Sequence, residues 1–413
     1  KVLKRILEVF EGWSGLKINF DKTEIFPICY PETLWPDLMD VFPGKYSKFP
    51  GKYLGLPLHF RTVRRVDFQP LIDKITNRLA GWKGRMLSKA GRETLVKAVL
   101  SAQPIYHLTI FPAQKWLLKR IDKLRRSFLW KGNSPEFCSG GHCLINWSTT
   151  CLPKNRGGLG ILDLERFARA LRLRWLWLRW TVKEKAWAGM PLPCDKVDVD
   201  LFNASTIVTI GNGKMADFWG SSWIEGQAPK NMAPNLYKKA RRKNITVFKA
   251  LRNNYWIRFC APFTREEEVR EFVSLWHSIS STHSLNDLDD TISWRWSADG
   301  EYSSSSAYKI QFTTNFCKTH INPIWKAKTE PKCHFFAWTL LHNKILTSDN
   351  LQKRGCPCNQ NCSLCNVSPE TATHLCKDCP FAEEAWSMIL TWLICDSWTV
   401  FPKSDHYTRG GLD

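Results

Sequence analysis

Apolar residues recur every three or four positions over several long stretches of the chain, which is the spacing of an amphipathic helix. The pattern predicts one helix over Lys1–Phe10 and three more between residues 61 and 131. The second of these three runs from about Lys89 to Ser101, with Ser88 as its cap and Leu95, Ala98 and Val99 turned inward. It returns at Pro323 and continues up to a cysteine-rich segment. We therefore expect a mainly α protein with small β elements, an α+β fold.

Shorter stretches alternate apolar and polar residues, as a β-strand does. Near the N-terminus these stretches are Leu16–Phe20 and Lys52–Leu58. Further on, turn sequences predict two hairpins, one that pairs Ile207–Ile210 with Lys214–Trp219 and one within Asp290–Tyr302. The β elements are therefore expected to be small and local.

The third helix of the basic region begins after Pro112 and separates its side chains by type. Its apolar face holds Leu117, Ile121, Leu124 and Phe128, and its other face holds Lys115, Lys119, Lys123 and Arg126. Between residues 61 and 131 there are 17 Lys or Arg against four acids, within a net charge of +21, and Arg85, Lys89 and Arg92 belong to this surplus. Such a concentration favours nucleic acid as the partner. A solvated lysine-rich face and an anionic membrane are the alternatives.

Six of the fifteen cysteines lie between residues 356 and 379. Within that segment Cys362, Cys365, His374 and Cys379 have the spacing C-x2-C-x8-H-x4-C. Three thiolates and one imidazole complete a tetrahedral zinc shell without room for a catalytic water, so a structural Zn2+ is expected. The segment also offers other sulfurs, and a cluster of free thiols is the alternative to a metal site. The competing sulfurs are Cys356, Cys358 and Cys376, the last being the least favoured.

Composition indicates a globular protein, with 44% hydrophobic and 13% aromatic residues. There is no secretory signal and no apolar run of about 18 residues, so no membrane partner is expected. Cysteines clustered with a histidine favour metal binding over disulfides, and hence a reducing compartment, the nucleus or the cytoplasm. Because the first residue is Lys1, we expect the chain to be either a fragment or the product of a wrongly delimited reading frame.

Several segments resemble those of one family. "SGLKINFDKTE" (Ser14–Glu24) and "KYLGLPL" (Lys52–Leu58) resemble the last palm segments of reverse transcriptases from plant LINE-type (non-LTR) retrotransposons. The similarity continues through "LAGWKGRMLSKAGRETLVKAVLSAQPIYHL" (Leu79–Leu108) and "NRGGLGILDLERFARALRLRWLW" (Asn155–Trp177). It ends in "CSLCNVSPETATHLCKDCPFAEEAW" (Cys362–Trp386), which is similar to the family's zinc-binding module.

The resemblance implies an RNA-directed DNA polymerase whose catalytic carboxylates hold two Mg2+ ions. These carboxylates belong to palm motifs that the chain lacks, so the chain alone is expected to be inactive, and Mg2+ is expected only in the intact polymerase. The resemblance also gives Lys22 the place of a pyrophosphate-side lysine and gives Tyr53 a place in the primer grip. The implied partners are an RNA template, a DNA primer or target, and the missing N-terminal palm and fingers of the same polyprotein.

These patterns divide the chain into five parts. They are the end of the palm (1–60), a basic, helical, thumb-like region (61–183), a Trp-rich connector (184–322), a zinc-binding domain (323–390) and a tail (391–413). The expected function is nucleic-acid and zinc binding within a reverse transcriptase. The alternative is a stand-alone zinc-dependent nucleic-acid-binding or adaptor protein.

Overall fold

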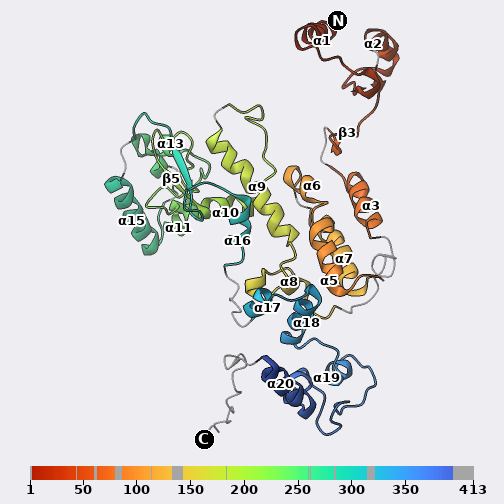
Figure 1. The fold of residues 1–413 in the computed structure, drawn as a ribbon. Helices are drawn as coiled ribbons and strands as arrows, with labels where there is room; N and C mark the ends of the chain where they lie inside the picture. The colour runs from red at the N-terminus through yellow and green to blue at the C-terminus, as the bar shows by residue number, and fades with distance from the viewer. Residues whose placement is uncertain are drawn as a thin grey trace.

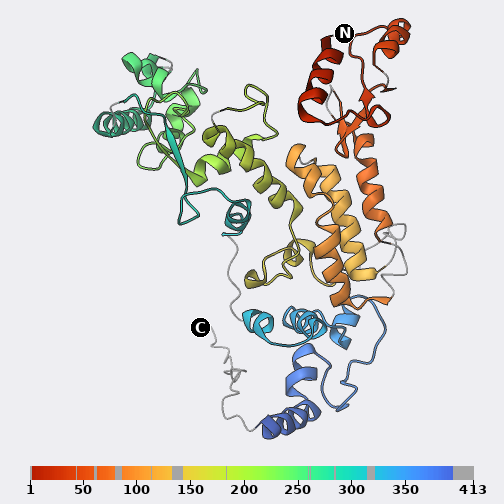
Figure 2. The ribbon, with the colours of Figure 1, turned by 45° about the horizontal axis from the view of Figure 1, so that its top comes forward.

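The computed structural model describes residues 2–42, 44–59, 63–79, 86–112, 114–132, 143–182, 184–258, 260, 262–282, 285–313 and 321–393. Within these residues helices predominate and the strands form two-stranded sheets, so the expected mainly α fold with small β elements is confirmed. We distinguish an N-terminal segment (2–59), a helical bundle (63–181), a connector (184–313) and a C-terminal module (321–393). Figures 1 and 2 show the bundle between the N-terminal segment and the C-terminal module, with the connector at its side.

The N-terminal segment contains α1 (Val2–Ser14), α2 (Trp35–Val41) and a parallel pair of strands, β1 (Glu24–Ile25) and β2 (Lys45–Tyr46). The strand predicted for Leu16–Phe20 is wrong. Instead, the Asn19 side chain accepts the backbone N–H of Lys22 at 3.1 Å and caps a 3-10 turn, Phe20–Lys22. This cap bends the backbone into a turn, and no described strand lies beside it to pair with.

The stretch Lys52–Leu58 is not one strand but a hairpin of β3 (Gly51–Tyr53) and β4 (Leu56–Leu58). The two turn residues, Leu54 and Gly55, have φ angles of 50° and 81°. A two-residue turn with both positions in the left-handed region matches the twist of the strands that it joins, and glycine adopts that conformation at low cost.

The helical bundle contains α3 (Gln69–Asn77), α5 (Lys89–Leu95), α6 (Ile105–Ile110), α7 (Lys115–Lys131), the short α8 (Trp147–Thr150) and α9 (Leu164–Thr181). The predicted apolar face of α7 is confirmed, since all four of its residues are buried. They join a core with Phe68, Ile75, Val96 and Leu100.

The second helix of the bundle buries a different set of residues from the set predicted. Ser88 caps it as expected, by accepting the N–H of Gly91 at 3.2 Å. After α5, however, a π-helical turn covers Val96–Leu100, and Ser101 donates its N–H to the carbonyl of Val96 at 2.9 Å. The extra residue in this turn rotates the helix, so Val96 and Leu100 are buried, whereas the predicted Ala98 is exposed and Val99 is half-buried. The predicted Leu95 is half-buried and packs against the core, as expected.

Arg125 is a buried cation that ties α7 to its neighbours. Its guanidinium donates to Asp122 Oδ1 at 2.7 Å, to Ser101 Oγ at 2.8 Å and to the carbonyl of Leu162 at 2.7 Å. A buried charge is tolerated when it is paired and hydrogen-bonded in this way. The arginine therefore fixes α7 against the π-helical turn and the entry to α9.

The connector begins with α10 (Lys196–Ser205), whose Asp198 pairs with Arg172 of α9 at 2.6 Å and 2.9 Å in a buried contact. Its only described sheet pairs β5 (Thr206–Thr209) with β6 (Thr291–Trp294) in antiparallel register. Between these strands lie α11 (Pro229–Met232), α12 (Pro234–Lys239), α13 (Val247–Leu251), α14 (Tyr255–Arg258) and α15 (Glu266–Thr282), and α16 (Ser304–Ile310) follows β6. Tryptophans fill its core: Trp219, Trp223, Trp256 and Trp294 are almost fully buried.

Both predicted hairpins of the connector are wrong, and Asp290 explains why. Its buried carboxylate accepts four backbone N–H groups, from Gly211, Gly213, Met215 and Ala216, at 2.8 to 3.1 Å. These bonds wrap the segment after β5 around one side chain as a loop, so that segment cannot form a strand. β5 therefore pairs with the distant β6, which leaves no hairpin partner within residues 290–302.

The C-terminal module contains α17 (Asn322–Lys326), α18 (Pro331–Leu341), α19 (Ser348–Gln352) and α20 (Pro380–Leu393). Phe335 and Trp338 of α18 are buried in the core of the helical bundle. The C-terminal module is thus built onto the bundle through α18. Among the described residues, no helix combines the length and apolar character needed to cross a membrane.

Replacing Asp290 by Asn tests the loop around the carboxylate. The amide keeps one acceptor oxygen and turns an NH2 group toward backbone donors, so we expect the free energy of unfolding to fall by about 2–4 kcal/mol. Asp289→Asn, at the exposed neighbouring position, is the control and should change it by less than about 0.5 kcal/mol. Urea denaturation of the two variants gives the comparison, and equal stability would contradict this role of Asp290.

Candidate metal centre

Cys362 and Cys365 come from a tight turn between α19 and α20. The N–H of Cys362 donates to the carbonyl of Ser368, and its own carbonyl accepts the N–H of Asn366, both at 2.8 Å. Asn366 has a φ of 54°, which closes the turn. The turn projects both sulfurs to one side, and the N–H of Leu364 approaches the Cys362 sulfur at 3.4 Å.

His374 and Cys379 come from the opposite side of the centre, at the two ends of a π-helical turn. The turn covers His374–Asp378, and Cys379 donates its N–H to the carbonyl of His374 at 2.8 Å. Pro380 then starts α20, whose first turn is held to the Cys379 carbonyl by the N–H of Glu383 at 2.9 Å. The π-helical turn therefore brings together an imidazole and a thiol that are five residues apart.

The four side chains converge on one point. One ligand atom from each of Cys362, Cys365, His374 and Cys379 lies within 4.8 Å of all the others, and the Cys365 sulfur lies 3.3 Å from His374 Nε2. A tetrahedral zinc site with Zn–S bonds of about 2.3 Å places its ligands about 3.7 Å apart, so the donor set fits that ion. Cys362 and Cys379 are fully buried and His374 is nearly so.

The surroundings shift the thiol pKa values of Cys365 and Cys379 in opposite directions. Backbone N–H groups of Ser368 and Val367 donate to Cys365 and lower the pKa of its thiol to about 6. Burial raises the pKa of the Cys379 thiol above its ordinary value. Zinc binds the thiolate form, so a bound ion would supply the charge that keeps the buried sulfur deprotonated. With four protein donors the centre is closed, which suits a structural role.

The other cysteines of the segment lie outside this group. Cys356 is exposed, and the thiol of Cys358 donates to the carbonyl of Ser348 at 3.3 Å. Burial raises the pKa of the Cys376 thiol, and the carbonyl of Cys376 accepts the Trp386 indole N–H at 2.8 Å. Among the described residues, only the four convergent side chains form a group of three or more His, Cys, Asp or Glu suited to a metal.

Hydrogen bonds connect the centre to the rest of the C-terminal module. Glu370, between the two ligand pairs, accepts the N–H of Ser348 at the start of α19 at 3.1 Å. Asn350 of α19 is buried and donates to the carbonyls of Asn343 and Ile345, just after α18. These hydrogen bonds link residues 362–379, which carry the four ligand candidates and are called the metal turn below, to α19 and the end of α18.

The predicted nucleic-acid contacts lie in different parts of the fold. Lys115, Lys119, Lys123 and Arg126 are all exposed along one side of α7. On α5, Lys89 is exposed and Arg92 is half-buried. Burial and the charges of Arg92 and Arg354 lower the pKa of Lys89, which places α5 close to the C-terminal module. Arg85 lies outside the described residues.

Two further candidates, Lys22 and Tyr53, lie in the N-terminal segment, away from α7. Lys22 is exposed in its 3-10 turn, and Tyr53 is 65% exposed at the tip of the β3–β4 hairpin. The structure thus brings together the four metal-ligand candidates and the α7 cations, each within its own group, but it does not gather all predicted contacts into one site. A further basic stretch, which the helical pattern does not mark, lies in the connector, where residues 226–265 contain ten Lys or Arg and no acid. Counting acids in a sliding window would have found it.

Part of the chain matches a known protein family. Residues 302–386 match the family described as zinc-binding in reverse transcriptase, and this match includes all four convergent side chains. The chain therefore carries a reverse-transcriptase zinc-binding region. It is similar to a protein of Arabidopsis thaliana provisionally named a ribonuclease H protein, with 24% identity over 373 residues. That alignment covers 81% of this chain, and the chain spans 58% of the length of the relative.

Removal of one ligand tests the metal centre. Cys379→Ser should lose bound zinc and unfold the metal turn, because zinc contributes on the order of 10 kcal/mol of apparent binding energy to such sites. Cys376→Ser, three residues away, should keep one zinc ion per chain. Zinc content by mass spectrometry and proteolysis of the turn, each with and without a chelator, give the readouts. If Cys376→Ser loses the metal and Cys379→Ser keeps it, the assignment of ligands is wrong.

Proposed function

We propose that the chain is the thumb and zinc-binding part of a LINE-type reverse transcriptase, and that it holds template and primer by their phosphates. The observation that carries this proposal is the cationic side of α7, built onto the same core as the zinc-binding region. In this proposal Cys362, Cys365, His374 and Cys379 bind a structural Zn2+. The family match at residues 302–386 supports a reverse-transcriptase setting.

The charge on α7 is available to a partner. Lys115, Lys119, Lys123 and Arg126 have no carboxylate within 4.0 Å among the described residues, and they are exposed. Their spacing of three or four residues sets them about 6 Å apart along the helix. A row of unpaired cations at this spacing can neutralise successive phosphates of a duplex and release the counterions held there.

Helix α18 of the zinc-binding region packs against the C-terminal end of α7 and stabilises it. Trp338 stacks on Trp130 of α7 at 6.4 Å between ring centres and donates its indole N–H to the carbonyl of Gly157 at 2.9 Å. Phe335 packs edge-on against the same Trp130 ring. A metal that orders the turn around α19 and α20 would therefore also help to hold the C-terminal end of α7.

Among the described residues, no group of three or more acids is arranged as a Mg2+ site would require. The two neighbouring acids Asp289 and Asp290 are unsuitable, because the carboxylate of Asp290 is already bonded to four backbone N–H groups. We infer that the carboxylates for Mg2+ belong to an upstream palm and that this chain alone does not polymerise. The name of the Arabidopsis relative suggests RNA hydrolysis as a second candidate activity. That reaction also needs clustered carboxylates, and in the described part of the chain no group of three or more acids is arranged to hold a metal ion.

The positions of α7, Tyr53, Lys22 and α1 suggest where each proposed partner would bind. An RNA template and a DNA primer or target would lie along α7, with Tyr53 at the primer and Lys22 near the departing pyrophosphate. The upstream palm and fingers would cover α1, whose apolar residues Leu3, Ile6, Phe10 and Trp13 are all exposed. The family match favours a reverse-transcriptase setting over a stand-alone adaptor. The nucleus or the cytoplasm is the compartment that we propose for it.

The cationic side of α7 can be tested by removing its charge. The variant Lys115→Ala, Lys119→Ala, Lys123→Ala and Arg126→Ala should bind an RNA–DNA duplex more weakly. The slope of log affinity against log salt should become shallower by about 0.9 for every phosphate that the variant no longer neutralises. Fluorescence anisotropy over a salt series measures both quantities.

A matched control removes four exposed cations elsewhere, by Lys4→Ala, Lys17→Ala, Lys309→Ala and Lys328→Ala. It removes the same charge, so its slope should stay near that of the unmodified chain. Equal slopes for the two variants would show that only net charge matters and would contradict the proposed contact.

A further inference from the structure

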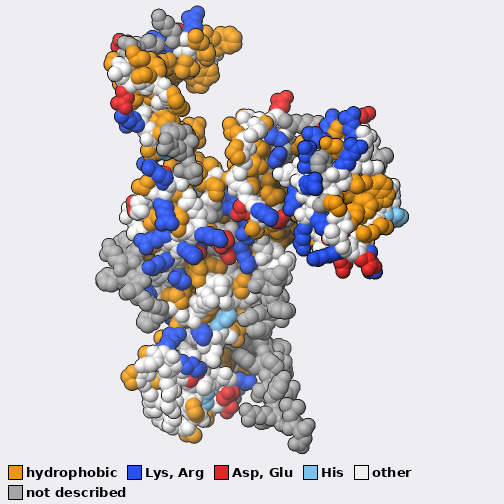
Figure 3. Space-filling view, turned by 180° about the vertical axis from the view of Figure 1, so that it is seen from behind, with side chains coloured by type: hydrophobic (Ala, Val, Ile, Leu, Met, Phe, Trp, Pro, Cys, Tyr) orange, Lys and Arg blue, Asp and Glu red, His pale blue; other side chains and the backbone are white. Residues whose placement is uncertain are grey.

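The connector carries its own concentration of positive charge. Residues 226–265 contain ten Lys or Arg and no acid. The apolar residues of this stretch, among them Leu236, Val247 and Trp256, are buried, so the cations are turned outward. The exposed ones are Lys238, Arg241, Arg242, Lys243, Lys249, Arg252, Arg258 and Arg265. Figure 3 shows Lys and Arg side chains gathered over the connector, and others over the helical bundle, on the same face of the molecule.

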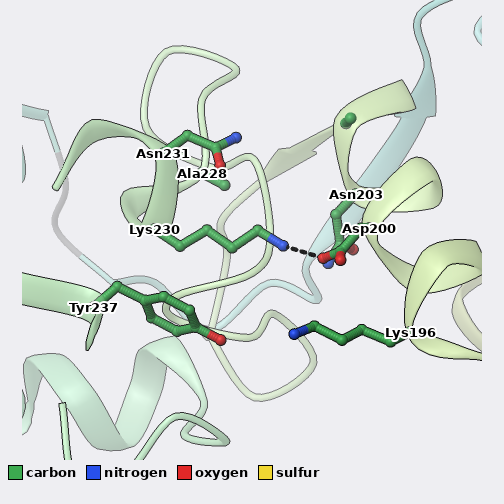
Figure 4. Close-up of a pocket in the computed structure, with 8 residues that line it drawn as sticks. Lys196, Asp200, Asn203, Ala228, Lys230, Asn231 and Tyr237 are labelled. Carbon is green, nitrogen blue, oxygen red and sulfur yellow. Dashed lines mark hydrogen bonds and ion pairs between the residues drawn. The ribbon is translucent and has the colours of Figure 1, made fainter. Parts of the chain in front are cut away.

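A cavity of about 380 Å³ lies beside these cations, between α10, α11 and α12. Its polar lining is rich in hydrogen-bond donors, namely Lys196, Lys230, Asn203, Asn231 and Tyr237. In Figure 4 the amine of Lys196 and the hydroxyl of Tyr237 face each other across the opening. The lining includes one carboxylate, that of Asp200. It is paired with Lys230, whose Nζ lies 2.5 Å from Asp200 Oδ1.

The positive charge at the cavity is not balanced by the protein. Lys196 is exposed and has no carboxylate partner within the described residues. Lys243 lies over the Tyr237 ring at 4.9 Å from its centre, which adds a second ammonium next to the cavity wall. By contrast, Lys239 on the far side of α12 is paired with Glu268 at 2.7 Å. The unbalanced charge therefore faces the cavity and the solvent beside it.

We propose that this surface is a second binding site for the phosphate backbone of nucleic acid, in which the cavity holds one phosphodiester and the cations of α12 and the loop after it contact its neighbours. Amine, amide and phenol donors that converge on one opening suit the oxygens of a phosphate. The inference rests on the proposed function, because it makes the connector a second contact for a nucleic acid that α7 also binds. Two linked contacts raise affinity beyond either one alone.

The test uses the full chain and a fluorescently labelled single-stranded RNA of mixed sequence. The variant Lys196→Ala, Lys238→Ala and Arg241→Ala should weaken binding about 10-fold and reduce the salt slope by about 2, which is about 0.7 for each of three phosphates of a single strand. The swap Lys196→Arg, Lys238→Arg and Arg241→Lys keeps the charge and should keep the slope. These side chains are exposed, so circular dichroism and thermal melting should be unchanged in both variants.

The outcomes separate this inference from the proposed function. A charge-matched control for the connector is Lys4→Ala, Lys17→Ala and Lys309→Ala, which removes three exposed cations. If the unmodified chain binds RNA, the α7 variant weakens binding and the connector variant binds like this control, the connector site is overturned and the proposed function stands. If only the connector variant weakens binding, the connector site is supported and the α7 contact fails. If the unmodified chain does not bind RNA at all, both fail.

Two competitors identify the chemistry of the ligand. Polyglutamate at equal charge and vesicles containing phosphatidylserine should displace RNA poorly, since neither offers a flexible row of phosphodiesters. If polyglutamate competes as well as unlabelled RNA, and the connector variant abolishes that competition, the surface recognises acidic protein and the proposal is overturned. Vesicles that bind through the same residues with equal strength would overturn it as well.

Discussion

The packing of α18 into the helical bundle is the contact on which most of the structure depends. Trp338 is fully buried, stacks on Trp130 of α7 and is hydrogen-bonded to the carbonyl of Gly157. A buried indole contributes a large apolar surface, and its N–H must find an acceptor once it leaves water. This one side chain meets both demands while joining segments that are far apart in sequence. The metal centre and the cationic face of α7 are placed relative to each other through this junction.

Polar centres organise two irregular segments of the chain, residues 211–216 of the connector and residues 362–379 of the C-terminal module. In the connector, the Asp290 carboxylate collects four backbone N–H groups into a loop. In the C-terminal module, three sulfurs and an imidazole converge within 4.8 Å. Both centres satisfy polar groups that would otherwise be costly to bury. They differ in that the loop needs only the protein, whereas a bound ion would stabilise the thiolates.

Positive charge occurs on two parts of the molecule that can face a polyanionic partner. The α7 cations follow one helix, whereas the connector cations come from α10, α12 and the loop after it. Cations nearer the interior are neutralised, since Arg172 is paired with Asp198 and Lys239 with Glu268. Internal cations are thus paired with carboxylates, whereas the surplus of positive charge faces solvent. This distribution is what long-range attraction of a polyanion requires.

The sequence by itself determined the features that depend on local spacing. The buried and exposed sides of α7 follow from the helical period, and the four convergent ligand residues lie close because two short turns bring each pair together. The tertiary structure decided the rest. The partner of β5, the inward rotation after the π-helical turn and the cavity between α10, α11 and α12 all depend on contacts between distant segments. Such contacts are chosen by competition among many possible partners, and a local pattern carries no record of which partner wins.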